Sequence, residues 1–332
     1  MLEVQGLTLQ ITVDGEPVRA VSNLSLNIQP GRVLALVGES GCGKSLTAQA
    51  LLRLGEFQGV KKTSGKILLE GIDLDAMDRE SLRKVRGGKI SMIFQEPMTA
   101  LNPVFSVGSQ IVEVIRLHLD MNKQQALARA KQLLHDVGLQ QVEQLLKQYP
   151  DSLSGGMRQR ILIAMAMAGD PDYIIADEPT TALDVSVQKR MIHLLRNLQR
   201  KRNLGMLLVT HDFGLVAEMA DDVAVMYAGE VIEYGAVADI FEAPSHPYTQ
   251  ALMQCRPEAN REKHATLKVI SGQVPAPGRW PSGCRFAPRC TKKIASCTQN
   301  DIALNCWQSP SGDSSISPSP HMARCLRVAE LQ

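Results

Sequence analysis

Hydrophobic and polar residues alternate at the start of the chain, a pattern typical of strands that bury one face. Residues 1–13 read MLEVQGLTLQITV, and short β-type runs recur at residues 20–28, 33–37, 66–69 and 89–94. Two later runs, at residues 173–176 and 206–209, are apolar and bounded by polar residues, as buried parallel strands are. The pattern predicts a β-rich part up to about residue 98 and a buried parallel sheet.

A helical period replaces this alternation from about residue 104 to about residue 168. The apolar positions that fall on one helical face are Ala126, Ala130, Leu133, Leu134 and Val137. Asn122 with Gln125 three residues later resembles a capping box, and Gly138 is placed to end the helix. We therefore predict a helical subdomain inserted over residues 104–168.

Length and charge narrow the class of protein. The chain has 332 residues with 44% hydrophobic residues and a formal net charge of +2, enough for about two globular domains and without a strong electrostatic case for nucleic acid. No apolar run approaches the ~20 residues of a membrane helix, and the first residues lack the basic and apolar regions of a secretory signal. We expect a protein inside the cell, held at any membrane by another protein, with no nucleic-acid partner.

A glycine-rich loop follows the run at residues 33–37. Residues 38–45 read GESGCGKS, which fits the phosphate-binding pattern between a strand and a helix. The glycines let backbone N–H groups turn toward phosphate oxygens, Lys44 would reach the β- and γ-phosphates, and Ser45 would bind Mg²⁺. The residues predicted to bind ATP here are Gly38, Glu39, Ser40, Gly41, Cys42, Gly43, Lys44, Ser45 and Leu46.

Cys42 lies inside this loop, next to the start of the predicted helix. A helix N-terminus lowers the pKa of a thiol, so one interpretation is a reactive cysteine that ATP protects from alkylation. The plainer interpretation is that any small residue fits at this position.

The run at residues 173–176 ends in two adjacent carboxylates, Asp177 and Glu178. Side chains alternate along a strand, so the two groups can have different tasks. We predict that Asp177 holds Mg²⁺ and that Glu178 points at the water that attacks the γ-phosphate, as a base or an orienting group.

Residues 153–160, LSGGMRQR, resemble the signature of ABC ATPases, with Met157 in the fifth position. The order of phosphate loop, Gln95, this signature, Asp177 with Glu178, Asp184 and His211 is that of an ABC nucleotide-binding domain.

The resemblance implies two such domains paired head to tail, with ATP between the phosphate loop of one and the signature of the other. It implies that Ser154, Gly155, Gly156 and Gln159 bind ATP from the signature side. Gln95 would then contact Mg²⁺ and water, His211 would contact the γ-phosphate, and Asp184 would link the two sites.

Residues 245–252 (SHPYTQAL) and 283–290 (GCRFAPRC) resemble the C-terminal region of oligopeptide and dipeptide importer ATPases, parts of which nickel importers share. The resemblance implies a D-type subunit paired with a homologous second ATPase subunit as a heterodimer, two membrane permease subunits and an extracytoplasmic solute-binding protein. It places the chain peripherally at the cytoplasmic face of the inner membrane. We predict an ABC nucleotide-binding domain over residues 1–255 and a Cys-rich region over residues 256–332.

Cys284, Cys290, Cys297 and Cys325 match the spacing of these relatives. Four thiolates can hold a [4Fe–4S] cluster, which we predict here, with a zinc site or no metal as the alternatives. Cys306 is an alternative to Cys325 as the fourth ligand.

The fold expected is α/β: a P-loop NTPase core of ABC type with a β-subdomain, a helical subdomain and a small Cys-rich C-terminal region. The function expected is ATP hydrolysis coupled to import of peptides or a related small solute. The alternatives are a soluble ABC ATPase of DNA repair or translation, and a non-catalytic regulatory subunit. The first 30 residues contain no aromatic residue to stack on adenine, so Val18 or Arg19 would cover the base.

Overall fold

A computed structural model describes residues 1–95, 100–180, 184–255, 269–307 and 320–327. The chain divides into two compact units, each described by itself below. The first unit consists of residues 1–2, 28–33 and 69–209, and the second of residues 3–27, 34–68 and 210–332.

Parallel strands form the sheet of the first unit. β6 (Ile90–Ile93) pairs with β7 (Tyr173–Asp177), which pairs with β8 (Gly205–Thr210). All residues of the three strands are buried, because covering both faces of a parallel sheet leaves no polar side. The two apolar runs predicted to be buried parallel strands, at residues 173–176 and 206–209, are confirmed by β7 and β8.

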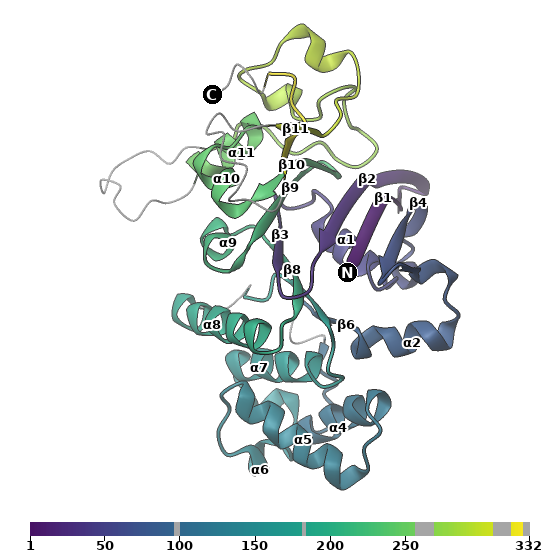
Figure 1. The fold of residues 1–332 in the computed structure, drawn as a ribbon, viewed down its shortest axis with the longest axis vertical. Coiled ribbons are helices and arrows are strands. Elements are labelled where there is room, and N and C mark those ends of the chain that lie inside the picture. The colour runs from purple at the N-terminus through teal and green to yellow at the C-terminus, as the bar shows by residue number, and fades with distance from the viewer. Residues whose placement is uncertain (96–99, 181–183, 256–268, 308–319, 328–332) are drawn as a thin grey trace. The chain divides into compact units, whose positions relative to one another are not determined.

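Helices make up most of the rest of the first unit. Its elements besides the sheet strands are β5 (Ile72–Asp73), η2 (Leu74–Ala76), α2 (Arg79–Gly88), α4 (Val107–His118), α5 (Lys123–Asp136), α6 (Val142–Leu145), η3 (Pro150–Ser152), α7 (Gly155–Ala166) and α8 (Val185–Lys201). Figure 1 shows α4, α5, α6 and α7 packed together, over the stretch where the helical period was found.

The capping box of α5 is present as predicted. The side chain of Asn122 accepts a hydrogen bond from the Gln125 N–H at 2.9 Å, and the Gln125 side chain accepts one from the Asn122 N–H at 2.9 Å. Gly138 follows the helix with φ of 73°, a left-handed conformation that glycine adopts without strain. Ala126, Ala130, Leu133 and Leu134 form the buried face.

The second unit contains two groups of strands. β1 (Leu2–Val13) lies between β2 (Glu16–Ile28) and β4 (Lys61–Leu69), and burial alternates along β1 as the sequence pattern predicts. In the other group β3 (Val33–Val37) runs parallel to β9 (Asp222–Tyr227). β9 then pairs antiparallel with β10 (Glu230–Ala236), β10 with β12 (His321–Ala323), and β12 with β11 (Asn305–Trp307).

The helical elements of the second unit are short. They are α1 (Lys44–Ala50), η1 (Gly55–Gln58), α9 (Phe213–Met219), α10 (Val237–Glu242), α11 (Pro247–Gln254), η4 (Ala287–Arg289) and η5 (Ala295–Thr298). The aromatic centre of this unit is formed by Tyr227, Tyr248 and Phe286, with ring centroids 4.6–5.3 Å apart. These rings join β9, α11 and the C-terminal turns in one core.

Some expectations fall on residues outside the described ranges. The domain boundary predicted after residue 255 stays a prediction, since residues 256–268 are not among those described. Within the described ranges, no helix is both long and apolar enough to cross a membrane.

Candidate functional site

The phosphate loop of the second unit connects buried strand β3 to helix α1. Gly38, Gly41 and Gly43 have φ values of 155°, 80° and 105°, which side-chain-bearing residues rarely adopt. A Cβ on Gly38 would lie 2.1 Å from the backbone oxygen of Met226 in β9. The loop conformation therefore requires glycine at this position, as the phosphate-binding pattern implies.

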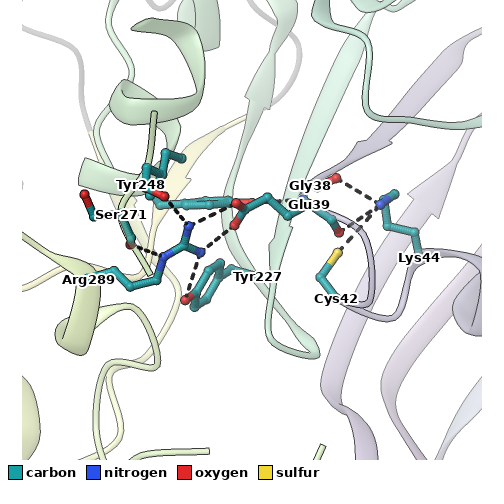
Figure 2. Close-up of polar contacts among 9 residues, drawn as sticks. Gly38, Glu39, Cys42, Lys44, Tyr227, Tyr248, Ser271 and Arg289 are labelled. Carbon is teal, nitrogen blue, oxygen red and sulfur yellow. Dashed lines mark hydrogen bonds and ion pairs between the residues drawn. The ribbon is translucent and has the colours of Figure 1, made fainter. Parts of the chain in front are cut away.

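Lys44 lies inside the curve of this loop with 5% of its surface exposed. Its ammonium donates hydrogen bonds to the carbonyl oxygens of Gly38, at 2.9 Å, and Glu39, at 3.1 Å (Figure 2). A phosphate oxygen is a charged acceptor and forms a stronger hydrogen bond than a carbonyl does. The buried ammonium is therefore placed to bind an anion that enters the loop.

The expected activation of Cys42 is wrong in direction. The Cys42 side chain is 1% exposed, and burial raises the pKa of its thiol above the ordinary value, although Lys44 acts in the opposite direction. Burial disfavours the charged thiolate more than the neighbouring cation favours it. The structure agrees with the plainer interpretation, a small residue filling the loop.

Glu39, the second residue of the loop, contacts two residues that the sequence analysis did not single out. Its backbone N–H donates to the hydroxyl of Tyr248 at 3.0 Å, and its carboxylate pairs with the guanidinium of Arg289 at 2.6 Å and 3.0 Å (Figure 2). Both partners lie in motifs that carried the importer resemblance, but a separation of 250 positions leaves no local sequence signal for such a contact.

Two predicted catalytic residues meet in the first unit. Asp177, 3% exposed, ends β7, and Glu178 follows it. The Glu178 carboxylate accepts a hydrogen bond from the Gln95 side-chain amide at 2.9 Å. Glu178 also has φ of 45°, and its backbone N–H donates to Val209 of β8 at 2.9 Å. The backbone hydrogen bond to Val209 holds the main chain of Glu178 in place, and the hydrogen bond from Gln95 orients its carboxylate.

The signature segment begins a helix of the first unit. Ser154 caps α7, and its hydroxyl accepts a hydrogen bond from the Met157 N–H at 3.4 Å. Gln159 is 2% exposed and donates its amide to the carbonyl of Pro179 at 2.7 Å. Gln159 thus connects the signature helix to the residue after Glu178, and its predicted contact with ATP stays a prediction.

Asp184 lies at the start of a helix, and His211 lies directly after a strand. Asp184 caps α8, where its carboxylate accepts hydrogen bonds from the Ser186 hydroxyl at 2.7 Å and the Val187 N–H at 2.9 Å, which lower its pKa. His211 follows β8 in the second unit and is exposed. Their predicted roles toward ATP stay predictions, as do those of Ser45 and Leu46 in α1.

Comparison with known proteins identifies the family. The ABC transporter family matches residues 21–181, and the oligopeptide/dipeptide transporter C-terminal region matches residues 232–297. The oligopeptide transport ATP-binding protein AppD of Bacillus subtilis (strain 168) is 46% identical over 304 residues, covering 92% of this chain and 92% of that protein. The chain belongs to the ATP-binding proteins of the ABC transporter family. It is an ABC ATPase, as its motifs predict.

Solved structures of ABC ATPases share its fold. The ATP-binding cassette MJ0796, in a dimeric post-hydrolysis state bound to ADP and phosphate, is 27% identical with a TM-score of 0.63, covering 71% of this chain and 99% of that chain. CbiO1 of Clostridium perfringens is 27% identical with a TM-score of 0.62, covering 73% of this chain and 90% of that chain. The predicted α/β cassette fold is confirmed.

The structure of this ABC ATPase does not support the predicted iron–sulfur cluster, nor the alternative zinc site, so both predictions are wrong. Within the described ranges, no group of three or more His, Cys, Asp or Glu side chains is placed to hold a metal ion. Cys284, Cys290, Cys297 and Cys325 do line one cavity, whereas Cys306 is exposed on β11.

The placement of the side chains is the reason for this correction. Burial raises the pKa of Cys284 to about 11 and also raises those of Cys290 and Cys325. These pKa values do not argue against a metal, because a bound ion would itself deprotonate its cysteine ligands. The spacing of the cysteines in the sequence predicted their proximity but not the geometry of a metal site.

Proposed function

We propose that this ABC ATPase powers the import of peptides, or of a related small solute, through a membrane transporter. The observation that carries the proposal is the match of residues 232–297 to the oligopeptide/dipeptide transporter C-terminal region, in the same chain as the ABC cassette. The name of AppD, an oligopeptide transport ATP-binding protein, supports it. A soluble ATPase of DNA repair or translation is not favoured, because it gives no reason for this region.

The residues of the ABC motifs have the chemistry that ATP hydrolysis needs. We assign Lys44 and the loop amides of residues 38–46 to the phosphates, except the Glu39 amide, which donates to Tyr248, because a buried ammonium and backbone N–H groups suit a polyanion. We assign Glu178 to the attacking water, with Gln95 holding its carboxylate at 2.9 Å. His211 is assigned to the γ-phosphate by its place in the motif order.

Mg²⁺ is the cofactor that this reaction needs. The donors proposed for it are the hydroxyl of Ser45, the side-chain oxygen of Gln95 and the carboxylate of Asp177, and such oxygen donors are those that Mg²⁺ accepts. Asp177 lies at the end of β7 with 3% of its surface exposed. When bound, the ion neutralises charge that develops on the phosphate oxygens.

The signature residues point to a second ATPase subunit. We propose that Ser154, Gly155, Gly156 and Gln159 bind ATP held by a homologous partner, and that Asp184 links the two sites. The dimeric state of MJ0796 supports this assembly. We further propose that the pair is a heterodimer, bound to two permease subunits at the cytoplasmic face of the inner membrane and supplied by an extracytoplasmic solute-binding protein.

Co-purification tests this proposal. The tagged full-length chain is expressed with its neighbouring genes, membranes are extracted in mild detergent, and the proteins that copurify are identified. We expect two permease-like proteins and a second ATPase. Recovery of soluble partners alone would contradict transport and leave the ATPase assignment intact.

A further inference from the structure

Glu39 of the phosphate loop is bound through three of its groups at once. Its carbonyl oxygen accepts from the Lys44 ammonium at 3.1 Å, its N–H donates to Tyr248 at 3.0 Å, and its carboxylate pairs with Arg289 (Figure 2). The first contact lies within the loop, while the other two come from the C-terminal part of the chain. Glu39 therefore joins the phosphate-binding lysine to a region far away in sequence.

Arg289 is held in one orientation. Its guanidinium forms two hydrogen bonds with the Glu39 carboxylate and donates others to the carbonyl oxygens of Ile270, at 3.1 Å, and Ser271, at 2.9 Å. Its side chain is 5% exposed. A two-pronged guanidinium–carboxylate pair has a defined geometry as well as a favourable energy. Arg289 thus restricts the directions that the Glu39 side chain can take.

Tyr248 restricts the backbone of the same residue. The tyrosine is 0% exposed and belongs to α11, and its ring packs on those of Tyr227 and Phe286. Its hydroxyl is therefore fixed when it accepts the Glu39 N–H. This N–H is one of the backbone donors of the loop, so the tyrosine sets the orientation of the peptide that precedes Glu39.

We propose that the C-terminal region sets the conformation of the phosphate loop through Arg289 and Tyr248, which act as positioning residues for nucleotide binding. The loop is rich in glycine, and a flexible loop must be ordered at a free-energy cost when it closes on phosphates. Contacts that order it beforehand reduce this cost. The proposal rests on the ATPase function proposed above and gives the importer-type region a direct part in it.

The phosphate loop is thus supported from a region that the ABC cassette match, residues 21–181, does not include. Tyr248 and Arg289 both lie in the matched importer region, residues 232–297. A purely structural role for the two residues would change the stability of the fold. A positioning role would change nucleotide affinity at unchanged stability of the core.

The test measures the dissociation constant of a fluorescent ADP analogue with Mg²⁺ for the full-length chain. Arg289→Met keeps the unbranched apolar part of the side chain and removes the guanidinium of the ion pair. Glu39→Gln removes the carboxylate charge of the same pair. We expect each to weaken binding about tenfold, and the double variant to bind no worse than either one, because both lose the same charge-assisted contact.

Matched controls separate this contact from its surroundings. Tyr248→Phe removes only the hydroxyl that accepts the Glu39 N–H, and we expect it to weaken binding about threefold. Lys292→Ala removes a tail charge bound to Gln250. We expect it to bind within about twofold of the wild type.

Thermal unfolding is recorded for every variant. ADP affinity within twofold of the wild type in both Arg289→Met and Glu39→Gln would overturn the inference, whatever their melting temperatures. If Arg289→Met fails to fold, the ADP affinities of the two single variants Glu39→Gln and Tyr248→Phe test the inference. If the wild-type chain itself binds no ADP, the proposed ATPase function fails, which is a different result from loss in the variants.

Discussion

At the scale of single residues, Glu178 is held in a conformation that costs energy. A φ of 45° is uncommon for a residue with a side chain, and such positions persist where surrounding contacts fix them. Here the backbone bond to Val209 and the side-chain bond from Gln95 supply these contacts. These two contacts hold the Glu178 side chain in place beside the end of β7.

We predict that Glu178→Gln binds ATP and stalls. The amide keeps the shape of the side chain but cannot accept a proton from the attacking water, so the hydrolysis rate should fall about 100-fold or more. Phosphate release measures hydrolysis, and a fluorescent ATP analogue measures binding. Glu143→Gln, which changes an exposed carboxylate paired with Lys131, is the control; wild-type turnover by Glu178→Gln would remove Glu178 from this role.

Cys42 shows the limit of sequence reasoning at this scale. The motif located the thiol correctly in the phosphate loop, and from its place near a helix start we expected a lowered pKa. The outcome depends on burial by residues distant in the chain, which raises the pKa instead. Local sequence predicts which groups are present, whereas the environment decides their charge.

At the scale of elements, the sequence predicted correctly those features that depend on interactions within one helix. The Asn122–Gln125 capping box and the apolar face of α5 lie within one helix, and both are present. The contact of Glu39 with Arg289 spans 250 positions. Such a pair depends on the packing of β9, α11 and η4 against one another, which no single segment of the sequence encodes.

We predict that His246 makes the start of α11 sensitive to acid. Burial lowers its pKa to about 4, while Glu233 acts to raise it and Arg324 to lower it. In the unfolded chain the pKa is near 6.5, so the stabilisation is complete above that pH and is lost as the pH falls toward 4. At pH 5 the loss is about 2 kcal/mol.

The comparison of His246→Asn with the wild type checks this. Asparagine is a good helix N-cap and does not titrate, so the melting temperature of the variant should fall less between pH 7 and pH 5. His135→Asn changes an exposed histidine in α5 and serves as the control. Parallel pH curves for wild type and His246→Asn would contradict the prediction.

At the scale of the whole molecule, the motif order was sufficient for the family. The phosphate loop, the signature and the carboxylate pair together identify an ABC ATPase, because each motif needs particular residue types and the three follow one another in a fixed order along the chain. The motif order did not decide whether the cysteines bind a metal. The four cysteine positions share a cavity, but whether their side chains are placed as metal ligands depends on tertiary packing.

Uptake by the assembled transporter shows whether ATP hydrolysis by this chain drives peptide import. The complex is reconstituted in vesicles with its solute-binding protein, and accumulation of a labelled peptide is followed with ATP supplied to this chain. We predict accumulation that requires ATP and is lost when Lys44→Ala replaces the wild-type subunit. ATP hydrolysis at the wild-type rate with no movement of di- or oligopeptides would contradict peptide import as the function of this chain.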